Sequence, residues 1–246
     1  MRDELATLLQ KLAMARRDDD GPWRPTVAGV LLGSREPRRW LPNAFIQAVA
    51  YRGANVVPEV DGANYQLDAK DLVGPLDEQI REACEFVFKH MSLPATKDLG
   101  RRDLPQFDMT AVFEAVVNAV AHRDYSIYGS KIRLRVFADR LELSSPGALP
   151  NTMSVESLAF RQAARNEAIS SLLAKCPTPS EHWLHTTRGT LMDKRGEGVS
   201  VILERSERHS NRRPIYRVID DTELLLTIYG RPDGDPDDQP LADTGP

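Results

Sequence analysis

A helix followed directly by a β-hairpin is the sequence feature that most constrains how this chain can fold. Asp108 and Thr110 can each cap a helix, and apolar side chains then recur at helical spacing to about Ala121. Residues 131–145 follow as two alternating runs of apolar and polar side chains, joined by a tight turn at residues 138–140. A helix and a hairpin in this order form the kernel of an α+β domain, so we predict an α+β fold.

Other periodic segments lie on both sides of this kernel. Upstream we predict an opening helix, two β-rich runs that form a small sheet, and an amphipathic helix, at residues 3–16, 26–33 with 44–53, and 75–91. Downstream we predict two helices and two final strands, at residues 166–174, from Gly198 onward, and within 214–230 around Asp220 and Asp221.

Composition divides the chain into three parts. Residues 92–107 are rich in proline, glycine and charge, which is typical of a domain boundary. We therefore predict a small α/β domain at 1–97, a second domain at 98–230, and a tail at 231–246 with the composition of a disordered segment. The connection at 151–195 is long and polar, and such connections are usually functional lids or partly disordered.

Charge and cysteine content narrow the class of protein. The net charge of −4 gives no overall basic field for a nucleic-acid duplex, so any contact with DNA would be local. Cys84 and Cys176 have no close cysteine neighbour, which argues against a disulfide framework and for a reducing compartment. The charged N-terminus lacks the apolar run of a signal peptide, and no window has the apolar length of a membrane span. We therefore expect a cytoplasmic protein.

Two polar side chains stand out on the kernel helix. On a helical wheel the apolar side chains gather into one stripe that must be buried, namely Phe113, Val116, Val117 and Val120. Glu114 and Asn118 lie one turn apart and off this stripe, flanked by alanines that leave room for a ligand. An amide oxygen can bind Mg²⁺ while a carboxylate orients or deprotonates a water. A solvated helix face explains the same spacing, and spacing alone does not decide between them.

Two glycine-containing stretches favour the ligand site. Gly147 follows a strand and would let a flat ring approach the backbone. Gly196 and Gly198 precede a helix, where free N–H groups and the helix dipole suit phosphate. Each stretch taken alone is weak evidence, since a short glycine pair before a helix is more often an ordinary loop and cap.

In this order, "EAVVNAVAHRDYS", "DRLELSSPGALP", "RNEAI" and "RGEGVSVI" closely resemble the ATP-binding domain of the GHKL family. That fold is shared by gyrase, histidine kinases, MutL-type repair proteins and a heat-shock chaperone. The branch it most resembles contains bacterial transcriptional regulators that are also described as helicase-related ATP-binding proteins. The resemblance covers about residues 98–220 and implies a two-layer α/β sandwich of GHKL ATPase type, with ATP and Mg²⁺ as cofactors.

The upstream segment "PTVAGVLLGSREPRRWLPNAFIQAVAYRG" resembles the closing part of the Schlafen/Alba-like domain that often precedes this ATP-binding domain. Residues 1–97 would then be a truncated version of that domain. We expect its larger N-terminal part, and any winged helix after the ATP-binding domain, to be missing, which argues against autonomous DNA binding.

The GHKL resemblance assigns roles to individual residues. Glu114 would polarise the attacking water as the catalytic residue, and Asn118 would be the magnesium ligand. The remaining nucleotide-binding residues would close the far end of the pocket, line the adenine slot, open the lid and wrap the phosphates: His122, Arg123 and Asp124; Ser145, Gly147 and Leu149; Arg165 and Asn166; and Gly196, Glu197, Gly198 and Val199. An ion pair between Arg123 and Asp124 is an alternative, purely structural interpretation.

Two positions depart from the wider GHKL pattern. Where that superfamily has an aspartate that accepts the adenine amino group, this chain has Ser144 and Ser145, so base selectivity would depend on a hydroxyl or on water. Glu197 adds a negative charge beside the expected phosphates. Its repulsion would weaken phosphate binding, and hydrolysis would be slow or lost, unless Lys194, Arg195 or magnesium offsets the charge.

Three hypotheses of function follow. The first is a Mg-ATP-binding protein with slow or no hydrolysis, acting as a nucleotide-dependent switch in a regulatory or defence complex. The alternatives are a catalytically inactive interaction module of the same fold and a DNA-binding transcriptional regulator. The expected partners are a nucleotide and, in the alternatives, DNA, another protein or a second copy of the chain, with no membrane involved.

Overall fold

A six-stranded mixed sheet forms the centre of the protein in the computed structural model, which describes residues 2–19, 21–57, 65–92, 105–150, 153–193 and 196–232. Its strands are β3 (Ile46–Tyr51), β4 (Gln66–Leu72), β5 (Ile132–Val136), β6 (Arg140–Pro146), β7 (Ile215–Ile219) and β8 (Glu223–Tyr229). Their spatial order is β4-β3-β5-β6-β8-β7. β3 and β5 run parallel, and the other neighbours are antiparallel.

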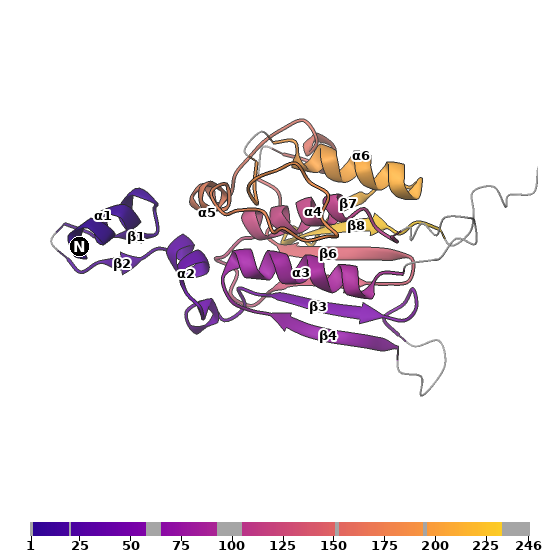
Figure 1. The fold of residues 1–246 in the computed structure, drawn as a ribbon, viewed down its shortest axis with the longest axis horizontal. Coiled ribbons are helices and arrows are strands. Elements are labelled where there is room, and N and C mark those ends of the chain that lie inside the picture. Colours follow the sequence, from indigo (N-terminus) through magenta and orange to yellow (C-terminus); the bar gives the residue numbers. More distant parts are fainter. Residues whose placement is uncertain are drawn as a thin grey trace, which may run out of the picture.

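Three helices cover one face of this sheet (Figure 1). They are α3 (Leu76–His90), α4 (Met109–His122) and α6 (Gly198–Ser210), and they contact β3, β6 and β8 respectively. The molecule is therefore an α+β fold built as a two-layer α/β sandwich, as the sequence predicts. The predicted helices at 75–91 and from Gly198, and the predicted hairpin and final strands, are all confirmed.

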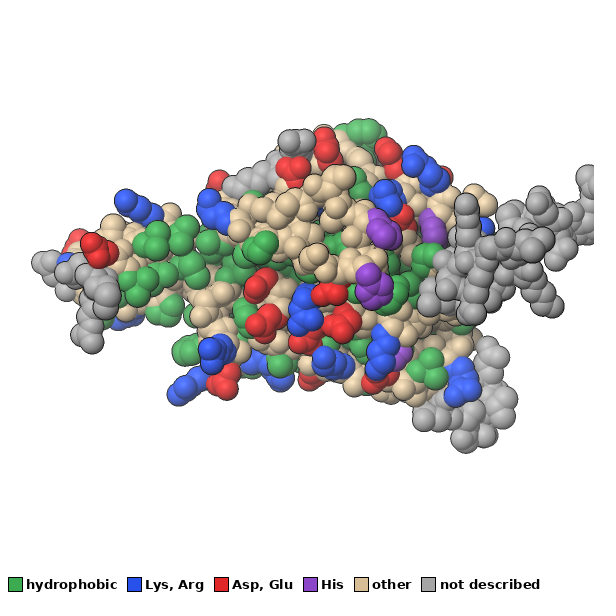
Figure 2. Space-filling model, in the orientation of Figure 1, with side chains coloured by type: hydrophobic (Ala, Val, Ile, Leu, Met, Phe, Trp, Pro, Cys, Tyr) green, Lys and Arg blue, Asp and Glu red, His purple; other side chains and the backbone are tan. Residues whose placement is uncertain are grey.

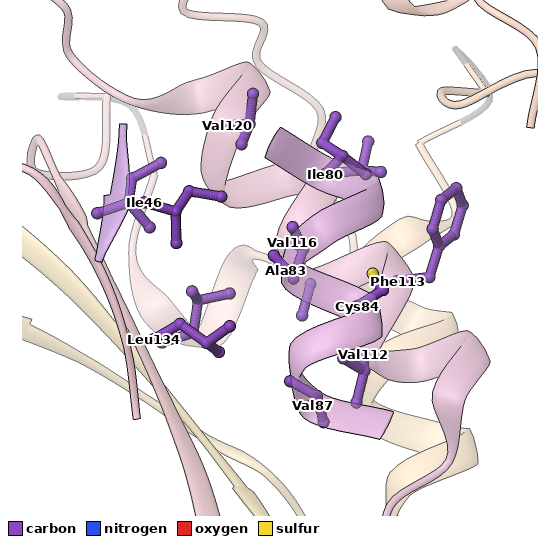
Figure 3. Close-up of a cluster of buried hydrophobic side chains, with 14 of the residues drawn as sticks. Ile46, Ile80, Ala83, Cys84, Val87, Val112, Phe113, Val116, Val120 and Leu134 are labelled. Atoms are coloured by element: carbon purple, nitrogen blue, oxygen red, sulfur yellow. The ribbon is translucent and has the colours of Figure 1, made fainter. Parts of the chain in front are cut away.

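The core lies between the two layers. Phe113, Val116, Val117 and Val120 of α4 are all buried, so the predicted apolar stripe is confirmed. They pack with α3 residues that include Ile80, Ala83, Cys84 and Val87 and with strand residues that include Ile46 and Leu134 (Figure 3). The outward face of α3 carries charged side chains (Figure 2), with an ion pair between Arg81 and Glu85 at 3.2 Å. α3 is thus amphipathic, as its spacing predicts.

Asp108 fixes where α4 begins. Its carboxylate accepts a hydrogen bond of 2.9 Å from the backbone N–H of Ala111, which is the bond expected of an N-cap. The same carboxylate accepts a bond of 3.0 Å from Nε of Arg205 on α6. One side chain therefore starts α4 and holds α6 beside it.

The prediction of a strand at 26–33 is wrong. Residues 27–33 form a helix, α2 (Val27–Gly33), whose N-cap Thr26 accepts a hydrogen bond from the N–H of Gly29. A short apolar run does not distinguish a buried helix from a buried strand, and the capping threonine decides the outcome here. The predicted small sheet of 26–33 with 44–53 is therefore also wrong, because β3 pairs with β4 and β5 instead.

The remaining elements are short. The opening helix is α1 (Arg2–Lys11), and the helix predicted at 166–174 is α5 (Glu167–Leu173). The rest are the two-stranded pair β1 (Ala15–Arg16) and β2 (Arg24–Pro25) and the 3-10 turns η1 (Pro37–Arg39) and η2 (Val155–Ser157). Within the described ranges every helix is too short or too polar to span a membrane.

The predicted domain boundary and tail fall largely on residues 93–104 and 233–246, which lie outside the described residues. Strands from both sides of that boundary share the central sheet, because β3 pairs with β5 over five residue pairs. The division into 1–97 and 98–230 stays a prediction.

Candidate functional site

A cavity of about 350 Å³ opens between α4, the turn after β6, the 153–193 connection and the start of α6. Many of the residues predicted for the nucleotide site line it: Glu114, Asn118, His122, Ser145, Gly147, Leu149, Arg165, Gly196, Gly198 and Val199. The four sequence motifs are therefore brought together around one space. Leucine and tyrosine side chains from the last two strands, among them Tyr216 and Leu224, complete its apolar wall.

Glu114 lies at one end of this cavity, and its carboxylate is buried with a side-chain exposure of 5%. It forms an ion pair with Arg188, which reaches α4 from the 153–193 connection. Arg188 also donates a hydrogen bond of 3.1 Å to the carbonyl of Leu191. The sequence does not predict Arg188, because nothing in its spacing relates it to the α4 helix. A burial this deep excludes the interpretation of Glu114 as part of a solvated helix face.

Asn118 and Gly198 approach each other closely in the wall of the cavity. A Cβ atom on Gly198 would lie 2.9 Å from Nδ2 of Asn118 and 3.2 Å from Oε2 of Glu114. Only a residue without a side chain lets the first turn of α6 come this close to the polar pair. Nδ2 of Asn118 is buried and has no hydrogen-bond partner among the described residues.

Such an unpartnered polar atom indicates a missing ligand, because buried polar groups in native proteins are nearly always hydrogen-bonded. Because Nδ2 is an N–H donor, the missing ligand has to supply an acceptor such as a phosphate oxygen. The amide oxygen of Asn118 and the Glu114 carboxylate are separately the kinds of oxygen ligand that Mg²⁺ prefers. Within the described ranges no cluster of three histidine, cysteine or acidic residues could hold a metal, so any cation would need ligand or water oxygens in its shell.

The turn after β6 forms the opposite end of the cavity. Gly147 has a φ of +117°, a conformation that favours glycine. A Cβ there would also lie 2.9 Å from Cβ of Asp124. Ser145 donates a hydrogen bond of 2.9 Å from its hydroxyl to the carbonyl of Ala119 on α4. Because a hydroxyl has one hydrogen, Ser145 can only accept from a ligand in the cavity.

An ion pair closes this end. Nη1 of Arg165 lies 3.2 Å from Oδ2 of Asp124. The Ser126 hydroxyl donates to the Asp124 carboxylate, and this bond, with the backbone N–H of Ser126 and the nearby arginines, lowers the pKa of Asp124. Arg165 lines the cavity, whereas Asp124 stands behind it. Among the described residues Asp124 forms its ion pair with Arg165, not with Arg123 as the structural alternative supposed.

Four predicted site residues do not line the cavity, and Asp124 is one of them. Arg123 is 2% exposed and donates to backbone carbonyls, including that of Ser130 at 2.7 Å, so it holds the loop after α4 together. Asn166 donates to the carbonyls of Ala121 and Arg123 and ties the start of α5 to the end of α4. Glu197 is an exposed N-cap residue of α6. Lys194 and Arg195, two of the groups that could offset its charge, lie outside the described residues.

His122 gives the site a dependence on pH. Burial, with a contribution from the charge of Arg165, lowers the pKa of His122 below its ordinary value of 6.5. The unfolded chain therefore binds the proton more tightly than the folded chain. We expect the free energy of unfolding to fall as pH drops below about 6.5, by at most about 1.4 kcal/mol per pH unit from this group. Urea unfolding at several pH values should show a smaller loss in His122→Gln, and equal losses in both proteins would contradict the assignment.

Comparison with known protein families matches residues 129–228 to a family described as "Putative ATP-dependent DNA helicase recG C-terminal". The match supports an ATP-binding domain family. The ATP-binding match includes Ser145, Gly147 and Gly198 of the cavity but begins after α4, so it does not include Glu114 or Asn118. A comparison with curated proteins gave no match.

Seven solved chains are similar to the protein, among them the crystal structure of the DIP2311 protein from Corynebacterium diphtheriae. That structure is 24% identical with a TM-score of 0.62, over 92% of this chain and 41% of that chain. At this identity the likeness concerns the fold. Because the match covers 41% of that chain, this protein spans less than half the length of the solved one.

Proposed function

We propose that the protein is a nucleotide-dependent switch that binds Mg-ATP in the cavity between α4, the turn after β6 and the start of α6. The single observation that carries this proposal is the approach of Gly198 to Asn118 and Glu114, with the Asn118 amide nitrogen buried and unpartnered. The helix dipole and free N–H groups at the start of α6 favour phosphate at the same place. The family match to an ATP-binding domain supports the same ligand.

Each residue has a defined task in this proposal. Asn118 would bind Mg²⁺ through its amide oxygen, and the ion when bound neutralises charge on phosphate oxygens. Glu114 would orient a water and accept its proton as that water attacks the terminal phosphorus, which releases ADP and inorganic phosphate. Ser145, as a hydroxyl that can only accept, would select an amino group such as that of adenine.

Slow hydrolysis is part of the proposal. The Glu114 carboxylate is held in an ion pair with Arg188, and this pair has to open before the carboxylate can accept a proton from water. Glu197 places a further negative charge at the start of α6. A protein that binds ATP but turns it over slowly suits a switch in a regulatory or defence complex, because the bound state then lasts.

Isothermal titration with Mg-ATP tests the assignment. We expect saturable binding by the natural protein, no detectable binding by Asn118→Ala, and binding without phosphate release by Glu114→Gln. Glutamine keeps the shape of Glu114 but cannot accept the proton. Glu85→Ala on the exposed face of α3 serves as the control and should bind and turn over as the natural protein does. Natural binding and turnover in both site variants would show that the assignment is wrong.

An interaction module without turnover is the second candidate, and the N-terminal arm favours it. The arm comprises α1, β1, β2 and the start of α2, and it projects from the body of the molecule (Figure 1). Leu5, Leu8 and Val27 are 57%, 52% and 48% exposed there, and apolar side chains gather on this arm in Figure 2. Light scattering with and without nucleotide separates the two candidates. An oligomeric state that does not change with nucleotide, together with no phosphate release, supports the second. A DNA-binding role would require a gel shift at low salt that weakens as salt rises.

A further inference from the structure

Arg188 is held in place by a well-anchored loop. Pro177 and Thr190 form an antiparallel bridge, and the N–H of Leu191 donates to the carbonyl of Cys176 at 2.9 Å. Trp183 and Leu191 are buried beneath this loop. The loop therefore fixes the backbone of Arg188 while its long side chain crosses to α4.

The guanidinium of Arg188 has donor capacity that the protein does not use. Nη1 donates to Oε1 of Glu114 and Nη2 donates to the Leu191 carbonyl. Nε is buried without a hydrogen-bond partner anywhere in the part of the chain that the structure describes. Nδ2 of Asn118, one turn along α4 from Glu114, is a second buried donor in the same condition. Two unused donors beside one cavity call for an acceptor-rich ligand, and leaving them unpaired is costly.

We propose that Arg188 recognises the terminal phosphate of a nucleoside triphosphate, an inference that rests on the proposed function. On binding, Arg188 would give up its ion pair with Glu114 and pair with the phosphate instead. The planar guanidinium matches phosphate oxygens as well as it matches a carboxylate, and it can donate two parallel bonds to either. A terminal phosphate carries more negative charge than the single Glu114 carboxylate, so it competes for the same donors.

The exchange couples recognition to catalysis. Without a triphosphate, Arg188 stays on Glu114 and the carboxylate is occupied. When a triphosphate binds, Arg188 moves to the phosphate and the Glu114 carboxylate becomes available to accept a proton from water. A diphosphate does not present the terminal phosphate and leaves the ion pair closed. Arg188 is thus a specificity residue for triphosphate over diphosphate, and its pairing holds the site inactive until the triphosphate arrives.

Dissociation constants for Mg-ATP and Mg-ADP, measured in parallel, test this inference. In Arg188→Met, which keeps an unbranched apolar stem but removes the guanidinium, we expect Mg-ATP to bind roughly 10- to 100-fold more weakly and Mg-ADP to bind within about twofold of the natural protein. Arg188→Lys should restore part of the preference, since it keeps the charge but not the fork. Arg217→Met, an exposed arginine on the edge strand β7, is the matched control and should change neither constant.

A second variant separates recognition from folding. Arg188→Met leaves the buried Glu114 carboxylate unpaired, so the double variant Glu114→Gln with Arg188→Met removes both charges. We expect the double variant to show the same loss of preference for Mg-ATP when compared with Glu114→Gln alone. An unchanged ratio of the two constants, or an equal loss for both nucleotides, would overturn the role of Arg188 while the proposed function stands. Failure of the natural protein to bind either nucleotide would overturn both.

Discussion

Replacing Gly198 by valine is expected to abolish nucleotide binding and leave the fold intact. The new Cβ would lie 2.9 Å from Nδ2 of Asn118 and 3.2 Å from Oε2 of Glu114, and the Cγ atoms would extend into the space proposed for magnesium and phosphate. If an overpacking cost of about 1–3 kcal/mol falls on the ligand-bound state, binding weakens by roughly 10- to 100-fold before any lost contacts are counted. Gly198 has no positive φ, so its backbone conformation does not require glycine, and the close contacts of a new Cβ are with the ends of the Asn118 and Glu114 side chains, which line the cavity.

Titration with Mg-ATP measures the loss of binding, and a thermal melt measures whether the fold is intact. Gly129→Val is the control, because a Cβ on Gly129 meets nothing within 4 Å, and it should bind as the natural protein does. Tight binding by Gly198→Val would place the phosphates elsewhere. A melting temperature that falls strongly would instead show that Gly198 serves the fold.

Of the substitutions proposed for this protein, Phe113→Ala should lower the free energy of unfolding the most. Phe113 is fully buried on α4 and lies in the core near Cys84 and Val112 (Figure 3). Removal of a buried phenylalanine costs about 3–5 kcal/mol, because the transfer free energy is lost and a cavity remains. That is a large share of the roughly 5–15 kcal/mol by which a domain is stable.

Chemical denaturation gives the free energy of unfolding directly. Phe160→Ala makes the matched control, because Phe160 is 88% exposed and its removal should change stability by no more than about 0.5 kcal/mol. Comparable losses in the two variants would mean that Phe113 does not pack in the core as described.

The kernel of the fold was predictable because its signals are local and mutually consistent. Asp108 caps α4, the apolar stripe of that helix has the 3.6-residue period, and the hairpin of β5 and β6 alternates with period two. The polar face with Glu114 and Asn118 was predicted from the same wheel. Their proximity to Gly198 was implied only by the resemblance to a family, because Asn118 and Gly198 are 80 positions apart and no local pattern links them.

The predictions failed where a local pattern was ambiguous or absent. Residues 27–33 read equally well as a strand, and only the capping by Thr26 and the packing of α2 decide for a helix. The edge strand β4 was not predicted, because most of its side chains are exposed and its alternation of apolar with polar residues is limited to Leu67 and Ala69. Arg188 was missed for a different reason, since its partner Glu114 is 74 residues away and no motif links them.

The parallel pairing of β3 with β5 has a practical consequence for anyone who shortens this protein. β3 is an interior strand whose backbone bonds to β4 on one side and to β5 on the other. A fragment that stops before residue 105 would carry β3 with the N–H and C=O groups of one edge unpaired. It would keep α3 but lose α4, so the buried apolar side chains that pack against α4 would be exposed. We expect such a fragment to aggregate, and a fragment that begins at residue 105 would likewise expose the unpaired backbone groups of β5.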